Sequence, residues 1–144
     1  MGSRKKLPET NGMGVENYAT NEINMVIKQK LSDSEEILIK RFIDTIVERE
    51  KYVNVNPKRA NKLFDEIHSI FKELRKKKQL KRLEPLMEHN NNSVVNFAAK
   101  YYLIVDEKKA INKLKELAKS GGMIAFEINI LIDQWKKGEV TFNY

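Results

Sequence analysis

The residues best suited to metal chemistry are two histidines and the acidic side chains near them. Asp65 precedes His68 by three residues, so the two share one face if this segment is helical. Bundles that bind two metal ions use Glu-x-x-His on two helices plus two further glutamates. Here an acid-x-x-His pair occurs once, since His89 has no acidic residue at that spacing. A surface contact between Asp65 and His68 is the simpler reading, and we predict no metal site and no cofactor.

The familiar catalytic arrangements each lack a required part. No nucleophile-elbow motif accompanies the serines and histidines. Gly121-Gly122 is not followed by the Lys-Ser or Lys-Thr of a phosphate-binding loop. The chain has no cysteine, which excludes cysteine nucleophiles, disulfides and thiolate metal sites. We therefore predict that the protein is not an enzyme and has no catalytic residues.

A run of basic residues is the strongest functional signal. The formal net charge is +7, and the segment from Lys72 to Arg82 carries seven basic residues and one acidic residue, Glu73. The rest of the chain is therefore close to neutral. Clustered lysine and arginine attract phosphates or acidic protein surfaces. The predicted partner-binding residues are Lys72, Arg75, Lys76, Lys77, Lys78, Lys81 and Arg82.

Composition predicts a single globular domain after a polar tail. The chain has 144 residues, of which 41% are hydrophobic and 33% charged, enough apolar surface for one core. Residues 1–21 contain Gly, Asn and Pro with few spaced apolar residues, which predicts a flexible tail, and residues 22–144 form the domain. No long apolar run or secretory signal is present, so we expect no membrane contact and a cytoplasmic location.

Apolar residues at helical spacing predict about six helices. Apolar residues from Ile23 to Leu31 either form a short helix or lead into the next one. Ser32 to Glu35 matches a capping box at the start of the first long helix, which should end near Lys51 to Asn54. Asn56-Pro57 begins the second, which runs into the basic segment. A short third helix contains Pro85, which should shorten or kink it. We expect the others near residues 93–104, 107–118 and 123–137.

The ends of the later helices are marked by polar and glycine residues. Asn92 or Ser93 should cap the fourth helix, which is apolar on most sides and is expected at the centre of the domain. Ser120-Gly121-Gly122 should stop the fifth. After the last helix, alternate apolar residues either dock on the core or fray; these are Val140, Phe142 and Tyr144.

The stretch LEPLMEHNNNSVVNFAAKYYL, residues 83–103, resembles one HEAT-type repeat: a helix ending in Pro-Leu-Met, an Asn-containing turn and a second helix with Val94, Ala98 and Leu103. Residues 56–76 also resemble a small bacterial HEAT-like domain family of unknown function, and the similarity extends over about residues 38–138. Val95 stands where such repeats commonly carry Arg, so a ladder built on that Arg is not expected. The resemblance implies an all-α fold of stacked antiparallel helix pairs, a fragment of a HEAT- or armadillo-like solenoid.

Two functions remain open from the sequence. The first is a non-catalytic protein-binding module of a bacterial protein, an adaptor or a toxin-immunity-like protein, whose basic surface favours an acidic partner. The alternative is a nucleic-acid-binding HEAT-like protein that contacts phosphates through the basic cluster. No aromatic residue is interleaved with these lysines, as single-strand binders usually require.

Overall fold

The computed structural model describes the backbone of residues 20–144 and the side chains from residue 34 onward. The chain divides into two compact units, Met1–Glu36 and Ile37–Tyr144. In the first unit, the described residues belong to the start of helix α1. The predicted flexible tail lies outside the described residues except for Thr20 and Asn21.

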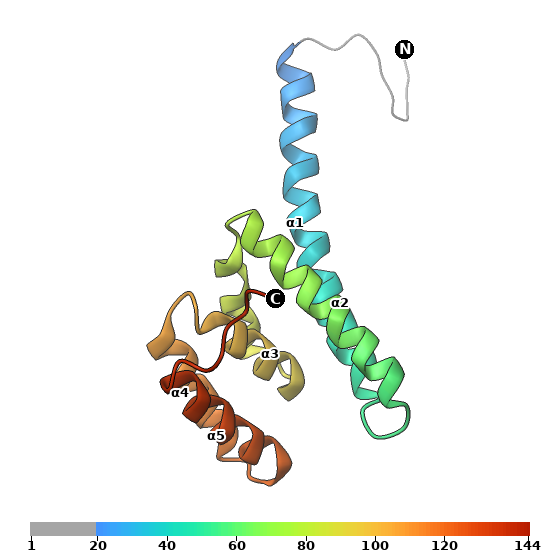
Figure 1. Cartoon of the computed structure of the whole chain (residues 1–144). Helices are drawn as coiled ribbons and strands as arrows, with labels where there is room; N and C mark the ends of the chain where they lie inside the picture. Colours follow the sequence, from blue (N-terminus) through green and yellow to red (C-terminus); the bar gives the residue numbers. More distant parts are fainter. Residues whose placement is uncertain (1–19) are drawn as a thin grey trace. The chain divides into compact units, whose positions relative to one another are not determined.

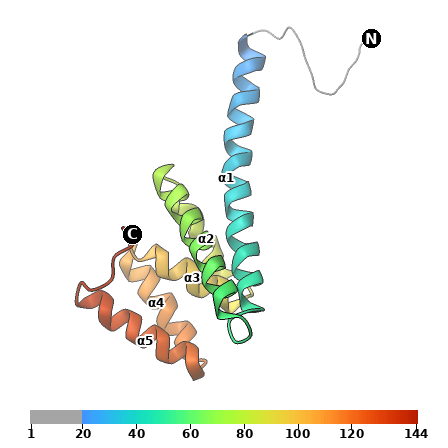
Figure 2. The same ribbon diagram turned by 45° about the vertical axis from the view of Figure 1, so that its right-hand side comes forward.

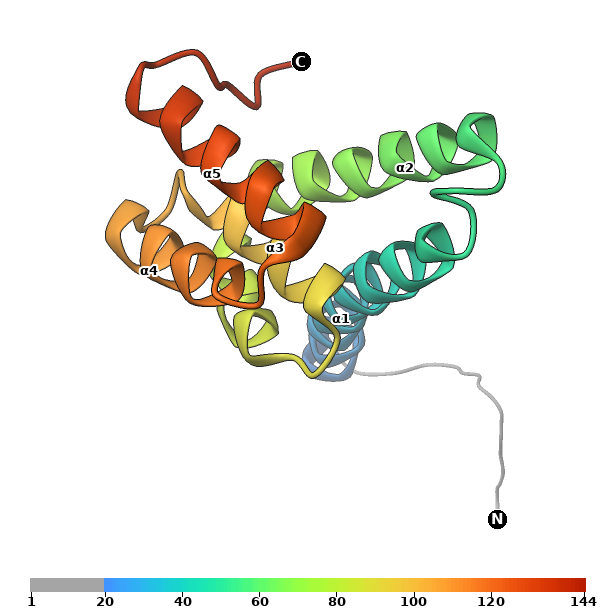
Figure 3. The same cartoon turned by 90° about the horizontal axis from the view of Figure 1, so that it is seen from below.

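The described part of the chain is all-helical and contains no strand. It comprises five α-helices and one 3-10 helix, η1, none of them long and apolar enough to cross a membrane. In the unit Ile37–Tyr144, α4 and α5 lie side by side and run in opposite directions (Figures 1 and 3). The helices are α1 (Thr20–Glu50), α2 (Pro57–Lys76), η1 (Leu80–Glu88), α3 (Asn92–Tyr102), α4 (Glu107–Ala118) and α5 (Gly122–Lys136).

The predicted start of the first helix at Ser32 is wrong, because α1 begins at Thr20 and continues through the capping-box sequence. Residues 20–31 contain no Gly or Pro and many good helix formers, so nothing stops the helix before Ser32. The predicted end near Lys51 is confirmed, since α1 ends at Glu50 and a turn leads to Asn56.

Side-chain caps explain where the following helices begin. The Asn56 side chain accepts a hydrogen bond from the Arg59 backbone N–H at 3.1 Å, as predicted, and Pro57 is the first helical residue. Asn91, rather than the predicted Asn92 or Ser93, caps α3, accepting from the backbone N–H of Ser93 at 2.8 Å. Asn91 precedes the first helical residue, so its side-chain oxygen can accept from the free backbone N–H groups of the first turn.

Backbone-specific residues separate the short elements. Pro85 lies inside η1, where it donates no backbone hydrogen bond, and this segment adopts 3-10 rather than α-helical geometry. Gly121 and Gly122 have φ angles of 76° and 74°, a left-handed conformation that favours glycine and ends the α4 segment as predicted. The tight reversal places α5 antiparallel to α4 (Figure 2).

One core joins the helices of the unit Ile37–Tyr144. The central position predicted for α3 is confirmed, because seven of its eleven residues are buried. Ala98 and Ala99 are fully enclosed, and their small side chains leave room for neighbouring helices. The core also contains Phe42 and Ile46 of α1, Ile67, Phe71 and Leu74 of α2, Leu83 of η1, Leu114 of α4, Ile128 of α5, and Phe142.

An aromatic cluster, defined as His68, Phe71, Tyr101 and Phe142, links α2, α3 and the C-terminal segment. The rings of Phe71 and Tyr101 stack with centroids 4.1 Å apart and planes inclined by 13°. Phe142 meets both rings edge-on, at 5.8 Å from Phe71 and 5.3 Å from Tyr101. The sequence left open whether the C-terminal segment docks on the core or frays. The contacts of Phe142 show that it docks.

We predict that Phe71→Ala lowers the free energy of unfolding by about 3 to 5 kcal/mol, because it removes a fully buried ring and leaves a cavity. Urea denaturation followed by circular dichroism measures this. Val55→Ala is the matched control: Val55 is 78% exposed, so the change should be within about 0.5 kcal/mol. Equal effects at the two positions would contradict the placement of the core.

Candidate functional site

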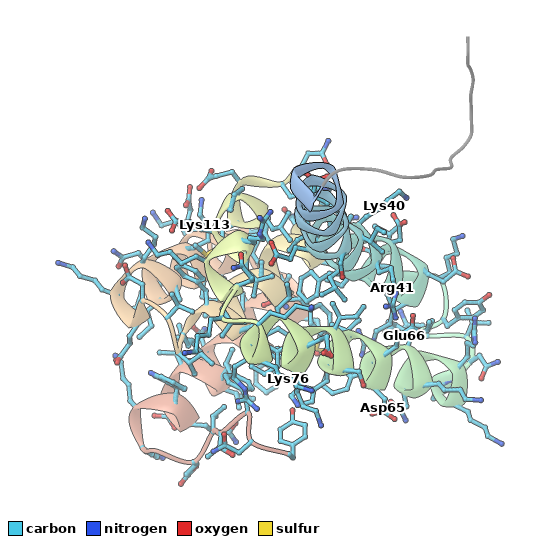
Figure 4. The ribbon with its side chains drawn as sticks, turned by 90° about the horizontal axis from the view of Figure 1, so that it is seen from above. Lys40, Arg41, Asp65, Glu66, Lys76 and Lys113 are labelled. Carbon is cyan, nitrogen blue, oxygen red and sulfur yellow. The ribbon has the colours of Figure 1, made fainter. Side chains whose placement is uncertain are left out.

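The predicted basic cluster lies at the end of α2 and the start of η1, where the chain turns. Lys76, Lys78 and Lys81 are exposed, and Lys77 is half-buried at the C-cap of α2. Lys76 is labelled on α2 in Figure 4. Among the described side chains, no acidic group forms an ion pair with any of these four lysines. They keep their charge available to a partner.

Three members of the predicted cluster instead contact this chain. The Lys72 ammonium donates to the main-chain oxygen of Tyr144 at 3.2 Å. Arg75 donates to the main-chain oxygen of Phe142 at 3.1 Å. Arg82 donates to the side-chain oxygen of Gln79 at 2.9 Å. The seven predicted residues therefore form two groups. Four lysines without an ion pair among the described side chains lie where α2 meets η1, which we call the α2–η1 corner, and Lys72, Arg75 and Arg82 hold local structure.

His68 is a buried hydrogen-bonded residue, so the surface contact predicted with Asp65 is wrong. Its Nε2 lies 3.1 Å from the main-chain oxygen of Tyr144, which can only accept, so Nε2 carries the proton. Nδ1 then accepts from the hydroxyl of Tyr101 at 2.9 Å. Burial lowers the pKa of His68, the hydrogen bond to Tyr144 partly opposes this, and the nearby cations of Lys72, Lys100 and Arg75 lower it further.

The acidic residues near His68 point elsewhere. Asp65 is exposed, and Glu66 lies 3.8 Å from the Arg41 guanidinium across the α1–α2 contact (Figure 4). Within the described side chains, no group of three His, Asp or Glu residues is placed to hold a metal ion.

A second charged surface lies between η1 and α4, and its charges are paired. Lys109 contacts Glu84 at 2.7 Å, and Lys113 contacts Glu88 at 2.9 Å and Glu116 at 3.0 Å. These ion pairs border an open cavity of about 420 Å³. Lysine and glutamate neutralise each other in these pairs, and Lys81 adds to the cavity lining one cation that has no ion pair among the described side chains.

Among the described side chains, a row of exposed apolar residues lies along one face of α5. Met123, Phe126 and Ile130 are 71%, 62% and 42% exposed. Their spacing of three and four residues places them along one side of the helix. The opposite side packs into the core through Ile128 and Ile132. We call Met123, Phe126 and Ile130 the α5 stripe.

The sequence contained a signal for the α5 stripe that was not used. Large apolar residues occupy two opposite sides of this helix, and charged residues occur only at Glu127, Asp133 and Lys136. A helix apolar on both sides is normally covered on both. The described elements cover only part of α5, so its composition indicates an exposed face that a partner could cover.

Among the described basic side chains, Lys100 of α3 is the one whose pKa is strongly altered. Burial, and then the positive charge of Arg49, lower its pKa to about 8, while Glu127 acts weakly in the opposite direction. Its ammonium lies over the ring of Phe97, 4.4 Å from the centroid. No motif at the sequence level distinguishes this lysine, because its environment is assembled from three helices.

Comparison of the chain with protein-family models, with curated proteins and with solved structures gives no match.

We predict that acid loosens the docked C-terminal segment. The pKa of His68 is lowered on folding, so the unfolded chain binds the extra proton first, and stability is lost as the pH falls below about 6.5. Trp135, the only tryptophan, stacks near Phe142 and reports this change by its fluorescence. His68→Gln cannot titrate, and its emission should stay constant from about pH 7 to pH 5. An identical acid response in both proteins would exclude His68 as the cause.

We also predict that Lys100→Met stabilises the fold by about 2 kcal/mol at pH 7. One pH unit of lowered pKa corresponds to about 1.4 kcal/mol, and part of the total is discounted because water still reaches the side chain. The wild type should gain stability between about pH 8 and pH 10, as folded Lys100 loses its proton before the unfolded chain does. Thermal unfolding at several pH values measures both effects, and the variant should lack the alkaline gain.

Above about pH 10, the buried tyrosines lower the stability of the fold, opposite to the effect of Lys100. Burial raises the pKa of Tyr101 well above its usual range and that of Tyr102 to about 12. Unfolded tyrosines ionise first, so wild type and Lys100→Met should both lose stability there. A Lys100→Met protein less stable than wild type at pH 7 would show that the ammonium contributes favourable contacts instead.

Proposed function

We propose that this protein is a non-catalytic, HEAT-like protein-binding module whose partner docks on the α5 stripe. The single observation that carries the proposal is a helix with large apolar residues on two opposite sides, of which the described chain covers only one. Isolated exposed apolar residues are common, but a row of large side chains on one helix face is typical of interaction sites.

The α5 stripe has the chemistry of an interface anchor. Aromatic residues and Met are enriched at protein interfaces, and Phe126 supplies a large ring between Met123 and Ile130. Asn129 and Asp133 flank the stripe and are exposed, so a polar rim borders the apolar centre. This arrangement of an apolar core and a polar rim is the usual anatomy of a protein interface.

Stacked helix pairs provide the physical reason for such a surface. In a HEAT-like stack each pair buries one face against its neighbour and presents another. Helix α4 packs against both α3 and α5, and α5 also borders α3 across a cavity that Lys100 and Ile128 line. The resemblance to bacterial HEAT-like domains supports two forms of this role, an adaptor or a toxin-immunity-like protein, and the lysines at the α2–η1 corner favour a partner with acidic groups.

Site-specific photo-crosslinking in the native host tests the proposal. With p-benzoylphenylalanine in place of Phe126, we expect a discrete adduct of defined mass, because the ring would lie in the interface. The same probe at Val55, which is 78% exposed in a turn, is the matched control and should give none. Adding Ile130→Asp to the Phe126 probe should reduce the adduct about 30-fold or more, the effect of losing a central apolar anchor.

Two outcomes would defeat the proposal. One is the same set of adducts at both probe positions. The other is an adduct at position 126 that survives Ile130→Asp unchanged, since a true interface should not accept a buried charge. An adduct of twice the chain mass would identify a second copy as the partner.

Nucleic-acid binding is the second candidate, favoured by the four lysines at the α2–η1 corner that have no ion-pair partner among the described side chains. Each phosphate contact releases counterions, so affinity should fall steeply with salt.

We predict that changing Lys76, Lys77, Lys78 and Lys81 to Ser lowers the slope of log affinity against log salt concentration by about four. Fluorescence anisotropy with random duplex and single-stranded DNA measures this slope. Changing the ion-paired Lys109 and Lys113 is the control. Absence of binding at low salt would remove this candidate.

A further inference from the structure

Two cations from different helices lie over the same two rings, those of Phe64 and Phe97, which we call the aromatic floor. The Lys100 ammonium of α3 lies 5.2 Å from the ring centroid of Phe64 and 4.4 Å from that of Phe97. The Arg49 guanidinium of α1 lies 5.8 Å and 5.6 Å from the same two centroids. Like charges repel most strongly where water is scarce, so this arrangement is costly unless an anion joins it.

Neither cation finds a hydrogen-bond acceptor in the described part of the chain. Arg49 Nε is buried and has no partner, which is rare for a buried polar atom. Lys100 forms ring contacts only, without an ion pair or hydrogen bond among the described side chains. The negative charge of Glu127 acts on Lys100, but its effect is weaker than those of burial and of Arg49. The charge of this pair is therefore only partly compensated within the described part of the chain.

The Lys100 side chain opens onto a cavity between α3 and α5. The cavity has a volume of about 190 Å³ and is lined by Asn96, Lys100, Glu127, Ile128 and Leu131. Asn96 and Lys100 supply nitrogen donors, and Ile128 and Leu131 supply apolar side chains. The lining thus combines donors, the carboxylate of Glu127 and a hydrocarbon surface.

We propose that this cavity binds a carboxylate carried on a short aliphatic chain, with the carboxylate paired to Lys100 and hydrogen-bonded to Asn96. The aliphatic part contacts Ile128 and Leu131, and the charge of Arg49 adds to the attraction from behind the rings. A carboxylate on a hydrocarbon chain satisfies both the donors and the hydrocarbon surface, whereas phosphate is polar on every side and leaves the hydrocarbon surface without a partner.

Glu127 bears on selectivity at the same site. Its carboxylate lines the cavity, so a ligand with two adjacent negative charges meets repulsion there. A monocarboxylate places its one charge at Lys100 and keeps its chain toward the hydrocarbon surface. Two sources carry this chemistry: a free short-chain acid, and a glutamate side chain of a protein docked on the neighbouring α5 stripe, which rests on the proposed function.

The test is a pH titration of the Lys100 ε-amine by NMR in protein labelled with ¹³C-lysine, with Lys100→Met identifying the resonance. Butyrate should raise the pKa of Lys100 by about one to three pH units, the effect of an opposite charge within a few ångströms. Phosphate at equal ionic strength should have a smaller effect. Lys113→Met is the matched control, because Lys113 is already paired with Glu88, and the response at Lys100 should persist in it.

A second variant separates the cavity from the charge. Leu131→Phe fills the cavity while leaving Lys100 in place, and it should weaken the butyrate response at least several-fold while the free protein still titrates at Lys100. A Lys100 resonance unaffected by butyrate overturns the proposal, as does an equal response to phosphate or an undiminished response in Leu131→Phe.

N-acetyl-glutamate N-methylamide distinguishes the two sources. A response to both this compound and butyrate assigns the cavity to a glutamate side chain, since the peptide backbone is then tolerated. A response to butyrate alone assigns it to a free acid. This readout is independent of crosslinking at the α5 stripe, so the site stands or fails separately from the proposed function.

Discussion

The stacking of Phe71 on Tyr101, closed at its edge by Phe142, is the interaction on which the unit Ile37–Tyr144 most depends. It joins α2, α3 and the C-terminal segment, which are separated along the chain, and the helices around it supply mainly aliphatic packing. Aromatic pairs contribute geometry as well as buried area, so they restrict how the helices approach. The position of every surface feature follows from this fixed centre.

That centre also determines what the polar groups near it can do. His68 is drawn into a bridge between Tyr101 and Tyr144, which leaves it no free nitrogen for a metal ion or a substrate. Lys72 and Arg75 donate to the C-terminal segment and so serve the fold. The chemical residues that the sequence made conspicuous are thus largely occupied, and the free surfaces lie at the α2–η1 corner and along α5.

The two surfaces of α5 have complementary chemistry. Its outer side is an apolar row, and its inner edge borders a cavity that contains a cation without an ion-pair partner among the described side chains. A binding module gains specificity when an apolar anchor and a charged contact must be satisfied together, because a wrong partner leaves the charge buried without a counterion. Val55 is also exposed, but it lies in a turn and does not belong to a row of apolar side chains beside a cavity.

By itself the sequence determined the all-helical class and most helix boundaries. Caps and breakers such as Asn56-Pro57, Asp106 and Gly121-Gly122 act through the local backbone, so their effect can be read from adjacent residues. It also determined that the charge is concentrated between Lys72 and Arg82. It did not reveal the true start of α1, because a capping-box sequence is also compatible with the interior of a helix.

Only the tertiary structure decided which of these residues are free, which are buried and which share a site. The pairing of His68 with Tyr144 spans 76 positions, and the aromatic floor beneath Arg49 and Lys100 combines three helices. Such contacts depend on how helices pack, and a spacing rule within one helix contains no information about its neighbours. The exposed side of α5 was decided in the same way, since an apolar helix shows its partner surface only once its other sides are covered.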